Sequence, residues 1–280
     1  MPQDTGRILL QVRSNRPSTL ALETTVRIAQ AFQAEIESLI IEDQQLFELA
    51  GFPFAREISL SGRGSRELSL ADVEHDARLT VAAVRRRVEA TARRAQVIHH
   101  TRVVRDEPTH ALCAACAETG TPWRLVALAE PFGADSIDTV RQVLASLAGR
   151  AGLLLFGPHA RRISGPMVIV LEDIDKLPAL LQMAQSLAAG ENAQIVILIT
   201  GDTAEDLRHM EGQVRLTLGQ SPNISIVAAA ATLGEASVVV EAVRRLKGSI
   251  VLGHTGGLLV PADGGLRHLA SLQSPLVLVR

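Results

Sequence analysis

The chain has 280 residues, of which 47% are hydrophobic, 21% are charged and only 2% are aromatic, with no Tyr and a formal net charge of -2. A typical domain has roughly 100 to 200 residues, so this length is enough for two domains with a sizeable core each. The near-neutral charge and the scarcity of aromatic rings argue against a nucleic-acid-binding protein, which needs a basic field for phosphates and flat rings for bases.

The first residues, MPQDTGRILL, lead directly into a predicted strand and lack the basic start and the apolar stretch of a signal peptide. The apolar stretches of the chain all fall far short of the roughly 20 residues that span a bilayer. We therefore expect a cytoplasmic protein with no membrane association.

Strands and helices alternate through the first half of the chain. Apolar runs predict strands at residues 8–12, 36–41, 97–104, 125–129 and 153–156. Helical periodicity predicts helices at residues 17–32, 70–95, 108–118 and 137–148. Cys113 and Cys116 fall in the interior of the third of these helices. We interpret them as buried small hydrophobic residues, because a redox Cys pair acts from a helix N-terminus.

The second half repeats this order, since residues 7–41 align with residues 166–200 without a gap and place Arg13 opposite Glu172. A repeat this long indicates two related domains, because solenoid repeats have periods of only about 20 to 50 residues. Runs such as VIVL and IVILI are typical of parallel strands covered on both faces. We therefore predict an α/β fold with a doubly wound, five-stranded parallel sheet in each half. The expected strands of the second half are 168–171, 195–200, 224–228, 250–252 and 276–279.

We expect a first domain at residues 1–157, a linker at 158–165 and a second domain at 166–280, because two Gly-Pro pairs bracket a short basic stretch there. The first half is the longer, and we assign its surplus to an insertion at about residues 42–73. This segment holds Phe47, Phe52 and Phe54. Three Phe close together indicate either a small satellite core, which we favour, or an apolar surface that contacts a protein partner.

The order of the elements, the turn after the first strand and the final passage VLGHTGGLLVPADGGLRHLASLQSPLVLVR resemble the universal stress proteins in their tandem form. In nucleotide-binding members of that family, G-x-x-G, about nine residues and then Gly-Ser or Gly-Thr hold the phosphates through backbone N–H groups. An Asp that closes the first strand meets the adenine or ribose. The resemblance implies two sheets packed as a pseudo-dimer across their final strands, and a regulatory or stress-adaptive role. It also implies ATP or another adenine nucleotide as the ligand, and a further homodimer is expected.

The second half reproduces the nucleotide-binding pattern in part. Gly253 and Gly256 form a G-x-x-G after the fourth strand, and Glu172 stands where the family has its Asp, with Asp173 beside it. The last pair of glycines arrives one or two positions early, whereas the first half has no G-x-x-G and carries Arg13 in place of the acid. We therefore predict a site for a nucleotide or another small anionic ligand in the second domain, formed by Glu172, Asp173, Gly253, Gly256, Gly257, Gly264 and Gly265.

Each of these charged residues also has a purely structural interpretation. Arg13 either holds an anion or, as we favour, lies in a salt bridge or in solvent at the rim. Glu172 and Asp173 either contact a ligand or act as N-terminal charges of the following helix. His254 and His268 either face a phosphate or, more commonly for such loops, are exposed.

Catalytic and metal motifs are absent from the sequence, which contains no H-E-x-x-H, no G-x-S-x-G, no Walker A sequence and no zinc-type Cys/His spacing. We therefore expect no enzyme, no catalytic residue and no metal site. Two other functions stay open. One is a scaffold that binds no ligand and contacts a protein through the Phe47–Phe54 region, and the other is a weak nucleotide hydrolase that positions Mg²⁺ with Glu172 or Asp173.

Overall fold

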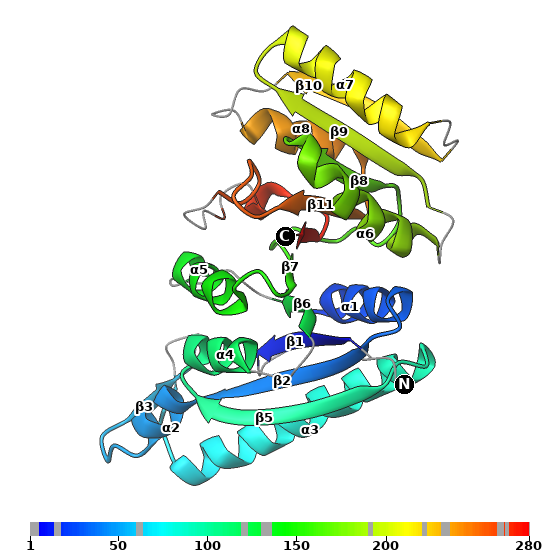
Figure 1. The fold of residues 1–280 in the computed structure, drawn as a ribbon. Helices are drawn as coiled ribbons and strands as arrows, with labels where there is room; N and C mark the ends of the chain where they lie inside the picture. The colour runs from blue at the N-terminus through cyan, green and yellow to red at the C-terminus, as the bar shows by residue number, and fades with distance from the viewer. Residues whose placement is uncertain are drawn as a thin grey trace.

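The computed structural model describes residues 6–13, 18–59, 64–118, 123–129, 136–189, 193–219, 223–230, 236–261, 266 and 269–279. Strands and helices alternate through both halves, as the apolar periodicity predicts (Figure 1). The strands are β1 (Arg7–Arg13), β2 (Glu35–Asp43), β3 (Arg56–Ile58), β4 (Ser65–Glu67), β5 (His99–Asp106), β6 (Trp123–Leu128), β7 (Gly152–Leu155), β8 (Met167–Leu171), β9 (Ile195–Gly201), β10 (Ile224–Ala230), β11 (Ile250–His254) and β12 (Leu276–Val279). The helices are α1 (Thr19–Ala31), α2 (Gln44–Ala50), α3 (Leu70–Arg94), α4 (Pro108–Ala117), α5 (Ser136–Leu147), α6 (Leu177–Ala189), α7 (Ala204–Leu218) and α8 (Ala236–Leu246), with 3₁₀ turns η1 (Ile174–Lys176) and η2 (Leu269–Ser271).

Within the described residues, the strands of both halves form one continuous ten-stranded sheet in the order β10-β9-β8-β11-β12-β7-β6-β1-β2-β5 (Figure 1). Pairing is parallel within each half, and β7 pairs with β12 in antiparallel register, Leu153 opposite Leu278 and Leu155 opposite Leu276. This seam leaves neither β7 nor β12 as an open edge. The predicted fold class, two doubly wound sheets packed across their final strands, is therefore confirmed.

Helices cover the sheet on both faces, and the side chains of each strand alternate between two hydrophobic cores. In β1, Ile8 and Leu10 belong to the core under α1, α3, α6 and α7, whereas Leu9 belongs to the core under α4, α5 and α8. All three side chains are at most 1% exposed. Burial on both faces explains why these strands read as unbroken apolar runs instead of alternating patterns.

Side-chain N-caps begin α1, α2, α4 and α7. Ser18 accepts a hydrogen bond from the backbone N–H of Ala21 at the start of α1, and Thr203 with Asp206 forms a capping box at the start of α7. Predicted and observed boundaries differ by up to two residues; the strand expected at residues 97–104, for example, is β5, His99–Asp106. Helix α3 ends in a left-handed residue, Gln96 with φ 56°, so the chain needs two further residues before it extends.

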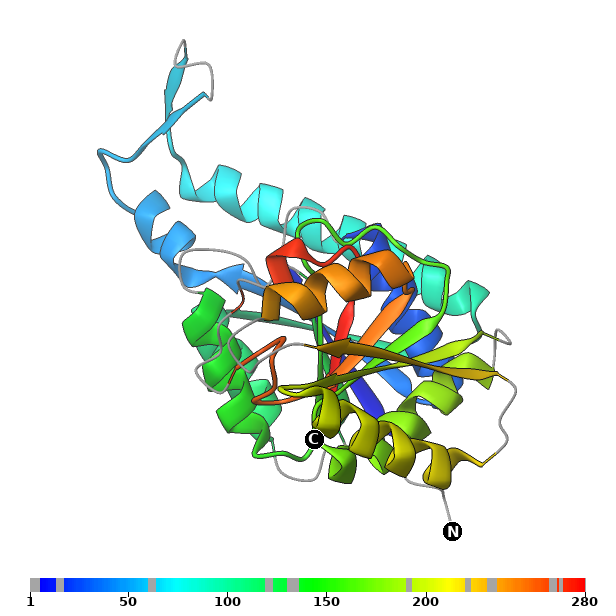
Figure 2. The same cartoon turned by 90° about the horizontal axis from the view of Figure 1, so that it is seen from above.

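The segment between β2 and α3 contains α2 and the two-stranded β3–β4 hairpin, which projects away from the main sheet (Figure 2). We call α2, β3, β4 and the residues that connect α2 to β3 the extension. Phe47 packs with Ala50 and Val73 in a small separate cluster, so the favoured satellite core is confirmed for this residue. It is wrong for Phe52 and Phe54, which are 51% and 77% exposed and stack with ring centroids 5.6 Å apart. The hairpin covers neither ring with a second layer.

The two cysteines lie in α4 and are free thiols. Burial raises the pKa of Cys116 to about 12. The thiol is therefore protonated at neutral pH and a poor nucleophile, as expected for a small buried hydrophobic residue.

We expect Leu154→Ala, at the seam, to lower the free energy of unfolding by about 2–5 kcal/mol, because it leaves a cavity in a closely packed layer. Leu154 is fully buried and pairs with Val277 across the seam. The matched control is Leu216→Ala on α7, whose side chain is 87% exposed and whose loss should change stability by about 0.5 kcal/mol or less. Urea unfolding at equilibrium measures both, and equal losses would show that the seam is not a tightly packed core.

Candidate functional site

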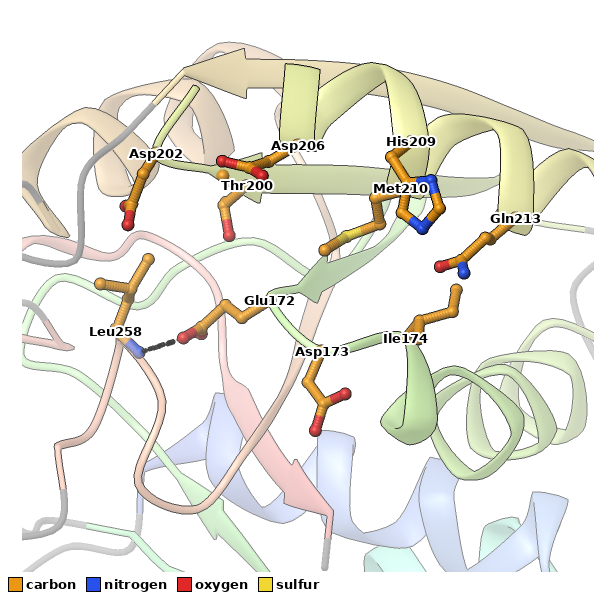
Figure 3. A pocket seen from close by; sticks show the side chains of 11 residues that line it. Glu172, Asp173, Ile174, Thr200, Asp202, Asp206, His209, Met210, Gln213 and Leu258 are labelled. Atoms are coloured by element: carbon orange, nitrogen blue, oxygen red, sulfur yellow. Dashed lines mark hydrogen bonds between the residues drawn. The ribbon is translucent and has the colours of Figure 1, made fainter. Parts of the chain in front are cut away.

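A pocket of about 600 Å³ opens at the carboxyl ends of β8 and β9, against α7 and the loop that follows β11 (Figure 3). Open α/β sheets bind ligands at this end of their strands, and the volume is in the range of small-molecule sites. The lining residues come from these four segments and are Glu172, Asp173, Ile174, Thr200, Gly201, Asp202, Asp206, His209, Met210, Gln213 and Leu258.

Glu172 is bonded to the glycine loop. Both oxygens of its carboxylate accept the backbone N–H of Leu258, each at 2.9 Å (Figure 3). Glu172 follows β8 and Leu258 follows β11, and the strand order reverses between these two neighbouring strands. The hydrogen bond therefore spans the crevice in which folds of this kind hold their ligands. An internal carboxylate thus accepts a backbone N–H of the glycine loop.

The glycines of the loop differ in what they do. A Cβ at Gly257 would lie 2.6 Å from Oε1 of Glu172 and 3.0 Å from Cε1 of His254, so only Gly admits the carboxylate at this distance. Gly256 has φ 83°, a left-handed conformation that favours Gly. Gly253 lies in β11, where a Cβ would meet only ordinary contacts at 3.8 Å or more. Of the G-x-x-G glycines, only Gly256 has a conformation that favours Gly. The residue that must lack a side chain to admit Glu172 is Gly257, which follows the pattern.

Burial raises the pKa of Glu172, and the N–H of Leu258 and the nearby His254 act in the opposite direction. A carboxylate withdrawn from water favours its neutral form unless charged or N–H partners compensate. His254 is half-buried, and its Nδ1 has no hydrogen-bond partner among the described residues. The position predicted to hold an anion thus contains a carboxyl group whose own charge is disfavoured.

The other carboxylates of the pocket are largely engaged in turns. Asp173 accepts the N–H of Asp175 at 2.9 Å and so caps η1, which favours the structural interpretation of this residue. Its side chain points away from Leu258 (Figure 3). Asp206 accepts from the backbone N–H and the hydroxyl of Thr203. With Asp202, the lining contains four acidic residues and, in the part of the chain that the structure describes, no Lys or Arg.

The structure thus brings Glu172 and Gly257 together, and Glu172 and Asp173 both line the pocket. The predicted glycines Gly253, Gly256 and Gly257 are not among its lining residues. Gly264, Gly265 and His268 lie outside the described residues, as does the side chain of Arg13. Sequence reasoning missed the contribution of β9 and α7, namely Thr200, Asp202, Asp206, His209, Met210 and Gln213. The available signal was the polar segment Thr200 to Thr203 directly after a buried strand, at the same sheet edge as Glu172.

The described residues contain no group of three or more His, Cys, Asp or Glu side chains placed to hold a metal ion. They also contain no helix that is both long enough and apolar enough to cross a bilayer.

Comparison with solved structures identifies the fold. A universal stress protein from Archaeoglobus fulgidus aligns over 98% of this chain and 96% of its own, with a TM-score of 0.63 and 13% identity. A protein from Pseudomonas aeruginosa provisionally named a universal stress protein aligns over 98% and 93%, with a TM-score of 0.63 and 14% identity. The cytoplasmic domain of a prokaryotic cation chloride cotransporter aligns over 98% and 95%, with a TM-score of 0.60 and 12% identity.

By sequence, no family model and no curated protein matches the chain. The structural likeness is therefore one of fold: this chain has the universal-stress-protein fold across both halves, as the sequence resemblance predicted. Fold alone does not fix function, which must be argued from the site.

We expect Glu172→Gln to change how stability depends on pH. Because the folded protein keeps the Glu172 proton to a higher pH than the unfolded chain does, the stability that this group contributes falls as pH rises from its ordinary pKa through its folded pKa. Gln keeps an oxygen for the N–H of Leu258 and does not titrate. The difference in unfolding free energy, wild type minus variant, should therefore decrease with rising pH, as measured by urea unfolding between pH 4 and about pH 8. A difference that rises with pH would contradict a raised pKa.

Proposed function

We propose that this protein is a regulatory ligand-binding protein of the universal-stress type, with its ligand site in the pocket at the carboxyl ends of β8 and β9. The observation that carries the proposal is the bond from Glu172 to Leu258, which closes the glycine loop from within. A ligand that reaches the loop must replace this carboxylate. Binding then stabilises the conformation in which the N–H of Leu258 faces the ligand, and so shifts the population of loop conformations.

The charge of the lining selects the ligand. Four carboxylates without a described Lys or Arg repel a triphosphate, whereas the amine of a base and the hydroxyls of a ribose can donate hydrogen bonds to them. The half-buried His254 offers a further polar contact beside the loop. We therefore infer a nucleoside, or a nucleotide with few phosphates, in place of the ATP that the sequence resemblance first suggests. The ligand that we infer therefore carries little or no negative charge, unlike the anionic ligand that the sequence suggested.

We propose that this site acts by binding and releasing its ligand and does not catalyse a reaction. A hydrolase of the kind considered above would use Glu172 or Asp173 to position Mg²⁺. Both carboxylates already accept backbone N–H groups, of Leu258 and of Asp175 respectively. The alternative therefore draws no support from the geometry of these two residues.

The second candidate function is that of an interaction protein, and the extension favours it. Phe47 is buried, but five other large apolar side chains of the extension are exposed: Leu46 at 47%, Leu49 at 51%, Phe52 at 51%, Phe54 at 77% and Ile58 at 68%. Contiguous exposed apolar surface of this kind marks interaction sites in soluble proteins. We infer that the extension binds either a second copy of the chain or another protein, and that a ligand in the second half can coexist with this contact.

We expect wild-type protein to bind adenosine more tightly than AMP, and AMP more tightly than ATP, in titration calorimetry. Glu172→Ala frees the N–H of Leu258 and removes one negative charge, so the affinity for AMP should rise about tenfold. Glu205→Ala is the control, because it removes an equal charge from an exposed position on α7 outside the pocket lining. An equal gain in both variants would show a general field effect. No heat with any of the three compounds in wild type or variant would refute the ligand site and leave the interaction function.

For the extension, we expect the double variant Phe52→Ser and Phe54→Ser to abolish self-association without lowering the unfolding midpoint, because both rings are exposed. Leu216→Ser, on the exposed face of α7, is the control and should associate as wild type does. Sedimentation velocity over a concentration series measures the association. A wild type that stays monomeric throughout would exclude a second copy as the partner.

A further inference from the structure

A second cavity, of about 430 Å³, lies between α1 and α6 where the two halves meet, and it shares no lining residue with the pocket at Glu172. The first half contributes residues of β1, α1 and the start of β6, and the second half contributes α6 and the end of β12. We call it the seam cavity. Its volume falls within the range of small-molecule sites.

The floor of the seam cavity is apolar. Ile8 and Leu125 are neighbours in the sheet and at most 2% exposed, and Phe32, Met183 and Val279 are partly buried around them. Trp123 also borders it, and its indole N–H is already satisfied by the carbonyl of Ala115 at 3.1 Å. The surface therefore presents carbon atoms and leaves no buried donor or acceptor of that ring to satisfy.

A glycine lies next to the floor of the seam cavity. Leu125 pairs with Gly152 in β7, and side chains on that strand alternate so that Gly152 shares its face with Leu154, in the core under α1 and α6. A Cβ at Gly152 would lie 2.9 Å from the carbonyl oxygen of Leu278 and 3.1 Å from Cδ1 of Leu125. The close antiparallel approach of β12 thus excludes a side chain at the seam.

The charged residues that line the seam cavity are both arginines, and Gln182 and Ser186 are its neutral polar residues. Arg124 and Arg150 both border it, and in the described chain no carboxylate does. Arg124 forms no ion pair or hydrogen bond with any described residue. Arg150 donates to the carbonyls of Ser146 and Leu147 at the end of α5, at 3.2 and 3.3 Å, which leaves its charge uncompensated. Two uncompensated guanidinium groups over an apolar floor are complementary to an anion with an apolar body.

We propose that the seam cavity binds an amphipathic anion: a hydrocarbon body lies on the floor between α1 and α6, and a carboxylate or phosphate head lies against Arg124 and Arg150. Both halves supply walls, so the ligand ties them together and stabilises the folded chain in proportion to its occupancy. This site is independent of the nucleoside proposal, because the two cavities have no lining residue in common.

The test uses the full chain and decanoate below its micelle concentration, followed by calorimetry and by the thermal unfolding midpoint. We expect decanoate to bind and to raise the midpoint. Octanoate should bind more weakly, by up to roughly fourfold for each methylene group that is lost from the apolar floor. Decan-1-ol has the hydrocarbon body without the charge, and acetate has the carboxylate without the body. Both should bind more weakly than decanoate and raise the unfolding midpoint less. Decyl phosphate in place of decanoate distinguishes a phosphate head from a carboxylate head.

Three variants locate the site. Arg124→Gln should weaken decanoate about tenfold by removing one charged contact. Arg86→Gln, at an exposed position of α3 away from the cavity, should leave it unchanged. Ala179→Phe fills the cavity from an exposed position of α6 and should abolish binding. Ser186→Phe, two turns further along the same helix face, repeats the block if the first variant folds poorly.

Three results would overturn the proposal: no binding of decanoate or decyl phosphate, equal binding by the Arg124 and Arg86 variants, or undiminished binding when the cavity is filled. Glu172→Ala should bind decanoate as wild type does. A loss in that variant would place the anion in the other pocket. If adenosine, AMP and ATP do not bind, decanoate binding would still support the seam cavity as a site, because the two cavities are lined by different residues.

Discussion

The antiparallel pairing of β7 with β12 is the interaction on which the rest of the structure depends. It joins two parallel five-stranded sheets into one and removes the edge that each would otherwise expose. It also sets the direction of the two halves, because strands that run one way before the seam run the other way after it. The end of β12 therefore lies beside the beginnings of β6 and β1, and Val279 comes to share a cavity with Ile8 and Leu125. Neither half alone contains the walls of that cavity.

The two copies of the repeat share their buried strands and covering helices but differ in the residues at strand ends and in the connections. Glu172 follows the first strand of the second half and closes the glycine loop, whereas the equivalent position of the first half is Arg13. The extension exists only in the first half, between β2 and α3. The shared architecture is maintained by buried strands, and the differences lie at strand ends and in connections, where side chains are free of the core. A ligand bound beside Glu172 and a partner bound to the extension are therefore each expected to contact one half of the molecule, whereas a ligand in the seam cavity contacts both.

The sequence predicted those features that depend on local pattern. Apolar runs and helical periodicity predicted the strands of the main sheet and most helices, and the resemblance to universal stress proteins implied packing across the final strands. The pattern failed where structure depends on distant contacts. Glu172 and Leu258 are 86 residues apart in the sequence. No local sequence pattern therefore predicts that the Glu172 carboxylate bonds to the glycine loop, or that Gly257 must lack a side chain to admit it. The three-residue strands of the hairpin are too short for periodicity to show, so the sequence could not decide between burial and exposure of Phe52 and Phe54.

The electrostatics of Glu172 bear directly on whether its closure of the loop is permanent. A buried carboxylate is costly unless cations or several donors compensate it. Here both oxygens share a single N–H, no described residue forms an ion pair with the carboxylate, and burial raises its pKa. A group held this weakly can leave the loop at small net cost, because solvation of the released carboxylate offsets the lost bond. A carboxylate clamped by Arg would fix the loop, whereas Glu172 leaves it closed but displaceable, as a regulatory site requires.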